Sequence, residues 1–507
     1  MRLLDIEHHD PRMCATSADG DISGMRLKIV TATSLFLLSA IGAAQGMEMR
    51  QKDADDFRDG LLSSFPGLAN SDFLTVKPAG DRLEVILDFN GFFEGLDPKT
   101  FRMAGFGPWS FFFVPQDNSV AKINAEDSVK ASLLAQGVDG KAIEGNYSIE
   151  SFVLDGLIVL PGSTQIKTLA KNIDFTSKLG GDQSTFRADS IDSTNILGSS
   201  DEGKGRWDYD GSTFFSGVYQ RSIQSEAPVF EISADLINHE YHWANVPSKE
   251  VINLASLLIT RGVGTVSNFE RVRAEMLRSF PLLSSLDERI YTDNLKVTSP
   301  IGNLSARKLN ARVALQGETA AMRLGMTVSG TDIKMDSPTI PSVYAALLPT
   351  SLDMTLVLDG MDFVSAGKEL AAGPVSNQAQ AEEMGRRFAL KLSRDGAQAF
   401  VLKQLVMKSD FYDLVMFGSV RENDEKKAQL KLWITARDFD KSIAAVQELA
   451  KTRPEINEVS LAMLMAKGFA AANADGGAHW DVIFNEDGTL IVNGQQVQGP
   501  RNAIQAQ

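Results

Sequence analysis

Cysteine and histidine are scarce in this sequence, which has Cys14 as its single thiol and five histidines in 507 residues. One thiol cannot build a disulfide framework, and five histidines leave little for a histidine-built metal site. Basic residues are also in deficit, 50 against 65 acidic ones, and the net charge of −15 disfavours a nucleic-acid-binding surface. Beyond the first 44 residues, no run approaches the ~18 uncharged apolar residues of a membrane-spanning helix. The length predicts roughly three domains.

The amino-terminal region has the order of a secretory signal. Arg26 and Lys28 precede an uncharged apolar stretch, residues 29–41, and small residues follow at 42–44 as a cleavage site. The apolar stretch is too short to cross a bilayer as a helix, and its basic flank disfavours the alternative, a buried core helix. We therefore expect residues 25–44 to be a cleaved signal peptide and the product to be periplasmic, soluble and without a stable transmembrane anchor.

Residues 1–24 are polar, mixed in charge and without periodicity, so we expect translation to start at Met25. Cys14 then lies upstream of the cleavage site, and the mature chain contains no cysteine. This predicts the absence of a lipoprotein anchor and of a thiol nucleophile.

Strand patterns dominate the mature chain. Residues 82–89 alternate between apolar and polar side chains, and the same period of two recurs at 309–315, 322–328, 354–358 and 430–436. One apolar and one polar face per strand indicates antiparallel sheets that are covered on one side. The turn dipeptides Asp487-Gly488 and Asn493-Gly494 predict a terminal meander of short strands.

Helical patterns are fewer and have recognisable ends. Capping residues and apolar periodicity predict helices over 251–259, after Ser248, and over 267–280, where Ser267 and Glu270 form a capping box. A longer helical stretch is expected over 377–405, with a break near Asp395-Gly396. Near the C-terminus, we expect one helix capped by Asp440 and a second that starts with a Thr452/Glu455 capping box and Pro454.

Two segments of the chain resemble each other. Residues 62–68 and 277–283 agree at five of seven positions, each at the end of an amphipathic helix that leads into alternating strands. We interpret this as a diverged duplication of a helix-plus-meander module, in which Phe65 and Phe280 are equivalent. The predicted divisions are 45–262, 263–425 and a C-terminal strand-helix-helix-hairpin module, 426–507.

The carboxyl-terminal region, with strand 432–436, two helices and the hairpin around 488–495, follows a signal segment and long runs of amphipathic strands. In this layout the chain resembles the YdgA-like and AsmA-like proteins of Gram-negative envelopes, families largely without assigned activity. The resemblance covers mainly the last ~80 residues, as judged from the sequence pattern. It implies curved, elongated sheets and a role in the cell envelope, with no catalytic residues to carry over.

Several local patterns mimic known sites. Residues 198–204 fit the spacing of a phosphate-binding loop, but Gly205 replaces the required Ser or Thr, so a polar hairpin loop is favoured. His239 and His242 are spaced by three in an extended segment, which points them to opposite faces rather than to one zinc ion. Residues 208–211 and 485–488 faintly resemble calcium loops and are expected to be turns. His479 is expected to end a loop.

Residues 105–115 form the most apolar stretch of the mature chain. Their five aromatic side chains fit either a lipid-binding groove or, as the favoured interpretation, a buried strand with Gly and Pro edges. No G-x-S-x-G elbow is present, and nothing specifies a catalytic carboxylate pair. We therefore expect no catalytic, cofactor-binding or metal-binding residues.

Together these patterns predict an α+β, β-rich fold of extended antiparallel sheets, partly covered by helices. Any sheet face that the helices leave uncovered forms a groove suited to acyl chains. The predicted function is that of a non-enzymatic envelope protein that binds lipid or another hydrophobic ligand in this groove. The alternative is an adaptor whose β edges engage other envelope proteins, and a periplasmic hydrolase ranks last.

Overall fold

A computed structural model places most of the chain. It describes residues 48–63, 74–88, 101–105, 107–116, 120–136, 142–159, 163–179, 181–200, 205–224, 227–247, 274, 284–317, 321–338, 340, 344–370, 378–392, 399–422, 428–473 and 477–499.

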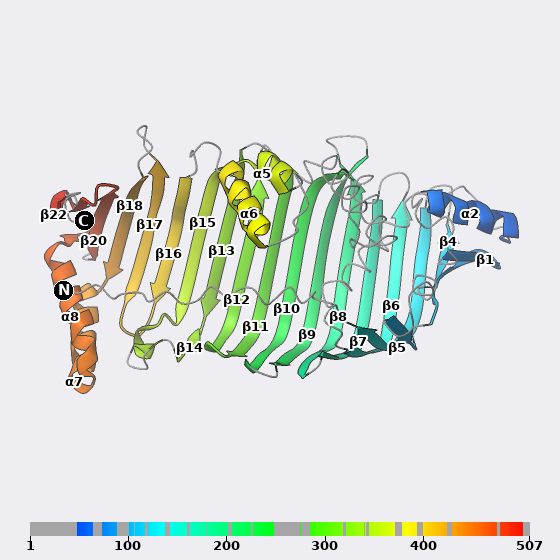
Figure 1. Ribbon diagram of the computed structural model, residues 1–507, viewed down its shortest axis with the longest axis horizontal. Helices are drawn as coiled ribbons and strands as arrows, with labels where there is room; N and C mark the ends of the chain where they lie inside the picture. Colours follow the sequence, from blue (N-terminus) through cyan, green and yellow to red (C-terminus); the bar gives the residue numbers. More distant parts are fainter. Residues whose placement is uncertain are drawn as a thin grey trace.

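Within these described ranges, the strands form a single antiparallel sheet of 22 members that extends along the molecule (Figure 1). The first half of the sheet contains β1 (Leu74–Ala79), β2 (Arg82–Leu87), β3 (Phe101–Ala104), β4 (Trp109–Pro115), β5 (Val120–Gln136), β6 (Ala142–Val159), β7 (Ser163–Leu179), β8 (Asp182–Ser199), β9 (Arg206–Gln224), β10 (Ala227–Pro247) and β11 (Ser285–Ser299). The second half contains β12 (Gly302–Gln316), β13 (Met322–Thr331), β14 (Lys334–Asp336), β15 (Ser351–Met361), β16 (Ala399–Lys408), β17 (Asp413–Glu422), β18 (Ala428–Arg437), β19 (Ala471–Ala472), β20 (Ala478–Asn485), β21 (Leu490–Val492) and β22 (Gln495–Gln498). The described helices are α2 (Gln51–Ser63), α5 (Phe363–Leu370), α6 (Gln378–Leu392), α7 (Phe439–Thr452) and α8 (Asn457–Gly468), with 3-10 turns at Ala345–Leu347 and Pro454–Ile456.

This architecture confirms the predicted α+β, β-rich class with amphipathic antiparallel strands. The alternating segments of the sequence lie in β2, β12, β13, β15 and β18. The terminal meander is also confirmed, because Gly488, Asn493 and Gly494 adopt the positive φ angles that its tight turns need.

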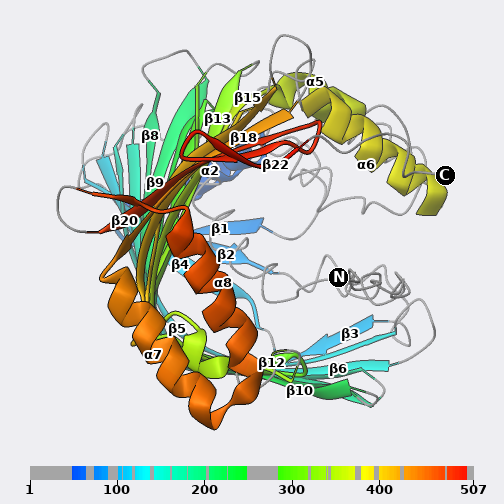
Figure 2. The ribbon, with the colours of Figure 1, turned by 90° about the vertical axis from the view of Figure 1, so that its left-hand side faces the viewer.

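The sheet bends so strongly that its cross-section is C-shaped when seen along the long axis (Figure 2). A row of irregular positions crosses β6 to β11. Asn172, Gly217 and Asn294 have φ angles of 51°, 58° and 51° on alternate strands, and pairing is interrupted beside each of them. We call this row the crease and define it by Glu150, Asn172, Asp189, Gly217, Asp235 and Asn294.

The crease reverses the alternation of side chains along each strand. In β7, Ala170 and Ile173 are both buried although three positions separate them, while Lys171 and Asn172 between them are exposed. A residue with positive φ in a strand produces this kind of bulge and bends the strand. Gly217 also leaves room for its neighbour, since a β-carbon there would lie 2.1 Å from Asp189 Oδ2.

The concave face can be assigned from α2, which lies inside the curve at the N-terminal end of the sheet (Figure 2). Phe57 and Leu61 of α2 share one hydrophobic core with Ile123 of β5 and Ile166 of β7. Directly paired residues of an antiparallel sheet lie on the same face. The face that carries Ile123 and Ile166 is therefore the concave one.

The other helices lie along the rim and at the C-terminal end. The hairpin of α5 and α6 connects β15 to β16 and stands beside the opening of the C in Figure 2. At the C-terminal end, Val446, Ala450 and Ile456 form a separate small core of α7 and α8. Trp480 Nε1 of β20 donates a hydrogen bond to the carbonyl oxygen of Ala466, 2.7 Å away, and so joins α8 to the sheet.

One predicted helix boundary and two predicted helix caps are wrong. The expected helix over 377–405 ends at Leu392, and residues 399–408 form β16, because pairing with β15 and β17 overrides their helical pattern. Asp440 does not cap α7, which starts at Phe439. Thr452 does not start a capping box but closes α7, and its hydroxyl donates to the Leu449 carbonyl at 3.0 Å.

Several predictions lie outside the described residues: the signal peptide at 25–44, the helices over 251–259 and 267–280, and the pair Phe65 and Phe280. The duplication and the module boundaries stay predictions. The sheet itself continues from β17 to β18 across the predicted boundary at 425 and 426. Among the described residues, no helix is long and apolar enough to cross a membrane.

Candidate functional site: the concave face of the sheet

One row of paired residues traces the concave face from end to end. The row starts at Ile123 of β5 and ends at Val482 of β20, and each strand that it crosses contributes one residue that pairs directly with the residue before it and the residue after it in the row. Its members include Ile166 of β7, Asn195 of β8 and Tyr241 of β10. The chemistry along this row changes twice. An apolar section covered by α2 is followed by a polar and aromatic section on β8 to β11, and a second apolar section follows from β12.

The second apolar section consists only of apolar side chains and glycine. We call it the apolar track and define it by Leu309, Ala311, Val313 and Leu315 of β12; Leu324, Met326, Val328 and Gly330 of β13; Leu352, Met354, Leu356 and Leu358 of β15; Phe400, Leu402, Leu405 and Met407 of β16; Leu414, Met416, Gly418 and Val420 of β17; Leu430, Leu432, Ile434 and Ala436 of β18; and Ala478, Trp480, Val482 and Phe484 of β20.

The apolar track is only partly covered. Val313, Phe400 and Phe484 keep 40%, 45% and 37% of their surface exposed, although they lie on the concave side. The track crosses six strand-to-strand steps of about 4.8 Å, so it is about 29 Å long. A bilayer's hydrocarbon core is about 30 Å thick, so one leaflet's acyl chains extend about 15 Å and fit within this length.

The polar section contains a buried hydrogen-bond network on β8, β9 and β10. Asn195 Oδ1 accepts hydrogen bonds from the hydroxyls of Tyr209, at 2.8 Å, and Tyr241. Asn195 Nδ2 donates to Ser193 Oγ at 3.0 Å, and Ser193 in turn contacts Thr213 Oγ1 at 3.1 Å. Burial and the nearby Tyr209 raise the pKa of Tyr241, which keeps its hydroxyl protonated as a donor.

Glu288 places a carboxylate beside this network. Its Oε1 accepts a hydrogen bond of 3.0 Å from Trp243 Nε1, and its Oε2 lies 3.7 Å from His239 Nε2. The Tyr241 ring lies between those of His239 and Trp243 on the same face, with centroid distances of 5.1 and 6.1 Å. We call Glu288, His239, Tyr241 and Trp243 the Glu288 cluster. The Glu288 side chain is 33% exposed, so the cluster is open to the concave side.

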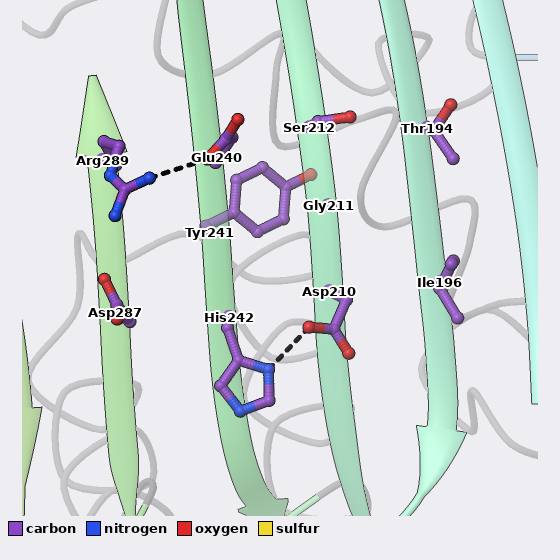
Figure 3. Close-up of a pocket in the computed structure, with 10 residues that line it drawn as sticks. All are labelled: Thr194, Ile196, Asp210, Gly211, Ser212, Glu240, Tyr241, His242, Asp287 and Arg289. Carbon is purple, nitrogen blue, oxygen red and sulfur yellow. Dashed lines mark hydrogen bonds and ion pairs between the residues drawn. The ribbon is translucent and has the colours of Figure 1, made fainter. Parts of the chain in front are cut away.

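The convex face carries a shallow hollow of about 390 Å³ over β8 to β11. Figure 3 shows its polar side chains joined in pairs: His242 contacts Asp210 at 2.6 Å, and Arg289 lies 3.7 Å from Glu240. Asp287 at its edge accepts two hydrogen bonds from Arg312, and these bonds hold the pKa of Asp287 below its usual range. Paired and largely exposed charges of this kind are typical of a solvated surface.

The structure separates the residues that mimic known sites. His239 lies on the concave face and His242 on the convex face, as predicted, and no group of metal-ligating side chains is found within the described ranges. Residues 198 and 199 end β8 and pair with β9, whereas 201–204 lie outside the described residues, so the prediction of a hairpin loop there stays a prediction. Residues 485–488 form a turn, as predicted. Residues 208–211 are not a turn but the interior of β9, because the polar row continues through both neighbouring strands.

Two further predictions concern aromatic neighbours. The segment 105–115 contains β4, so the predicted strand is confirmed; it is buried on one face only, where Phe111 and Phe113 are 3% and 1% exposed, and its other side chains are half-buried. His479 does not end a loop but lies within β20, where it pairs with Thr435. The strand that contains His479 continues into the terminal meander, and the pairing of β20 with β18 fixes the backbone conformation of His479.

Sequence reasoning missed the Glu288 cluster. The alternation of His239, Tyr241 and Trp243 is visible in the sequence, but Glu288 joins them only through the pairing of β10 with β11. Comparison with protein-family models gives no match for the chain, and comparison with curated proteins gives none either.

Proposed function

We propose that this protein binds lipids in the cell envelope, with their acyl chains on the apolar track. The observation that carries the proposal is the row-by-row continuity of apolar side chains from β12 to β20 on a partly exposed concave face. Large contiguous apolar surfaces are rare on soluble proteins and mark binding sites. The proposal includes export to the periplasm through the predicted signal at 25–44.

Acyl chains fit this surface better than a protein segment does. Most main-chain groups of the track's strands are engaged in pairing on both sides, so an extended peptide could add a strand only at an edge of the sheet. The edge strand β22 is short, and all its residues are exposed and mostly polar. A flexible hydrocarbon needs no hydrogen bonds and adapts to the mixed Leu and Met surface.

Native mass spectrometry of the protein isolated from the envelope, followed by lipid extraction, tests the proposal. We expect co-purifying lipid that disappears on delipidation and returns on incubation with phospholipid vesicles. Met326→Glu places a charge on the track between Val313 and Leu356 and should abolish lipid uptake.

Thr327→Glu is the matched control, because Thr327 is the next residue of β13 and lies on the convex face, where its hydroxyl contacts that of Thr355. This variant should bind lipid like the wild type. A protein without lipid under all these conditions, or equal lipid uptake by the two variants, would contradict the proposal.

A further inference from the structure

The concave face carries almost no charge. Between β10 and β20 its positions include the apolar track together with Ile237, His239, Tyr241 and Trp243 of β10 and Leu286, Glu288, Ile290, Thr292, Leu295 and Val297 of β11. Glu288 is the acidic residue in this set, and the set contains neither Lys nor Arg. A carboxylate in such surroundings is costly unless a partner compensates it.

Within the described chain, the partners of Glu288 compensate its negative charge only in part. Trp243 gives one neutral hydrogen bond to Oε1. Oε2 faces His239 Nε2 at 3.7 Å, which exceeds hydrogen-bond distance, and that nitrogen has no hydrogen-bond partner in the described part of the structure. The carboxylate thus remains able to accept hydrogen bonds from a ligand on the concave side.

The surrounding rings favour a cation at this point. Tyr241 and Trp243 lie next to Glu288, and the faces of such rings attract ammonium groups. The cluster also borders the apolar track directly, since Glu288 is paired with Val313. A ligand with its chain on the track can therefore place its headgroup against Glu288.

We propose that the Glu288 cluster selects lipids whose headgroup carries an ammonium group and fixes their direction, with the headgroup at β10 and β11 and the chains towards β20. This inference rests on the proposed function. A headgroup with only negative charge would meet the Glu288 carboxylate and no basic residue at the concave positions of these strands, so it is disfavoured.

The test uses three amphiphiles that share one alkyl chain, namely dodecylammonium, dodecanol and dodecanoate. Each competes with a fluorescent apolar probe, N-phenyl-1-naphthylamine, bound to the full chain, at concentrations below the micellar concentration of the two ionic amphiphiles and below the solubility limit of dodecanol. We expect dodecylammonium to displace the probe at a concentration at least about tenfold lower than dodecanol, as one charge-assisted hydrogen bond predicts, and dodecanoate to be the weakest.

Glu288→Gln should weaken the binding of dodecylammonium about tenfold or more and so remove the preference for the ammonium over dodecanol. Glu240→Gln is the matched control, because it changes the net charge equally but lies on the convex face beside Arg289. It should keep the wild-type preference. Thermal melting establishes that both variants fold.

A generic attraction to the acidic protein would fade when salt is raised from about 0.15 M to about 1 M, whereas a pair formed inside the groove is screened much less. This wild-type measurement decides the question even if Glu288→Gln does not fold. Equal binding of dodecylammonium and dodecanol, or a preference that high salt removes, overturns the headgroup inference and leaves lipid binding intact. If none of the three displaces the probe, the proposed function itself fails.

Discussion

The ring of Tyr241 lies across Gly211 of the neighbouring strand, where a β-carbon on residue 211 would come within 2.3 Å of Tyr241 Cζ. This close approach lets the tyrosine hydroxyl pass over β9 and reach Asn195 on β8. The glycine is thus required by its neighbour's side chain and not by its own φ angle.

Gly211→Ala should therefore displace Tyr241 and break its hydrogen bond to Asn195. We expect the free energy of unfolding to fall by about 1–3 kcal/mol in urea titrations, because a buried amide oxygen loses a donor. Gly325→Ala is the control, since a β-carbon there meets nothing closer than 3.8 Å and should be neutral or slightly stabilising. Equal effects of the two substitutions would contradict the role assigned to Gly211.

The crease gives a second prediction. Asn294 combines a φ of 51° with a hydrogen bond of 2.7 Å from its Nδ2 to Asp235 Oδ2. Asn294→Val should destabilise by about 1–3 kcal/mol, because a β-branched residue tolerates this backbone poorly. Asn294→Gly should cost much less. Asn310→Val, on β12 away from the crease, serves as the control and should cause little loss in the same titration.

The core under α2 gives a third prediction. Phe57 is 6% exposed, and its ring centroid lies 4.5 Å from that of Phe113. Phe57→Ala should cost about 3–5 kcal/mol, measured by thermal or chemical unfolding, because it leaves a cavity in a packed core. Phe417→Ala removes an equal side chain from the convex face, where Phe417 is 44% exposed, and should cost clearly less.

The pH dependence of stability gives a fourth prediction. Arg312 lowers the pKa of Asp287 in the folded state, so the unfolded chain binds protons more readily at this site. The stabilisation is full above the unfolded pKa of about 3.9 and is lost as the pH falls through the lower folded pKa. Because both side chains are partly exposed, Asp287→Asn should cost at most about 1 kcal/mol at neutral pH.

The difference between Asp287→Asn and the wild type should shrink in melting curves recorded from pH 5 downwards. Asp353→Asn is the control, since Asp353 contacts the neutral Gln404 and not a cation. A difference that stays constant down to pH 3 would show that the ion pair with Arg312 is not its source.

The strands themselves were predictable, because alternation at positions such as 309–315 reflects one buried and one solvated face. The bend was not, since Asn172 and Asn294 look like ordinary polar strand residues until their φ angles are known. The prediction that the helix continues to residue 405 was wrong for a related reason. Residues 399–408 form a strand because they pair with β15 and β17, and a local sequence pattern does not show this pairing. The apolar track follows from alternation, whereas the Glu288 cluster depends on a cross-strand register that one sequence does not reveal.

From β6 to β11, each strand hydrogen-bonds only to the strand before it and the strand after it in the chain, among the described residues. A polypeptide that emerges with its N-terminus first could therefore add each new strand to a partner that is already in place. Neighbour-only pairing also allows a hairpin to be inserted or lost without rearranging the others, as in repeat proteins. Each added hairpin would lengthen the concave face by about 9.6 Å, so the number of hairpins sets the length of this face.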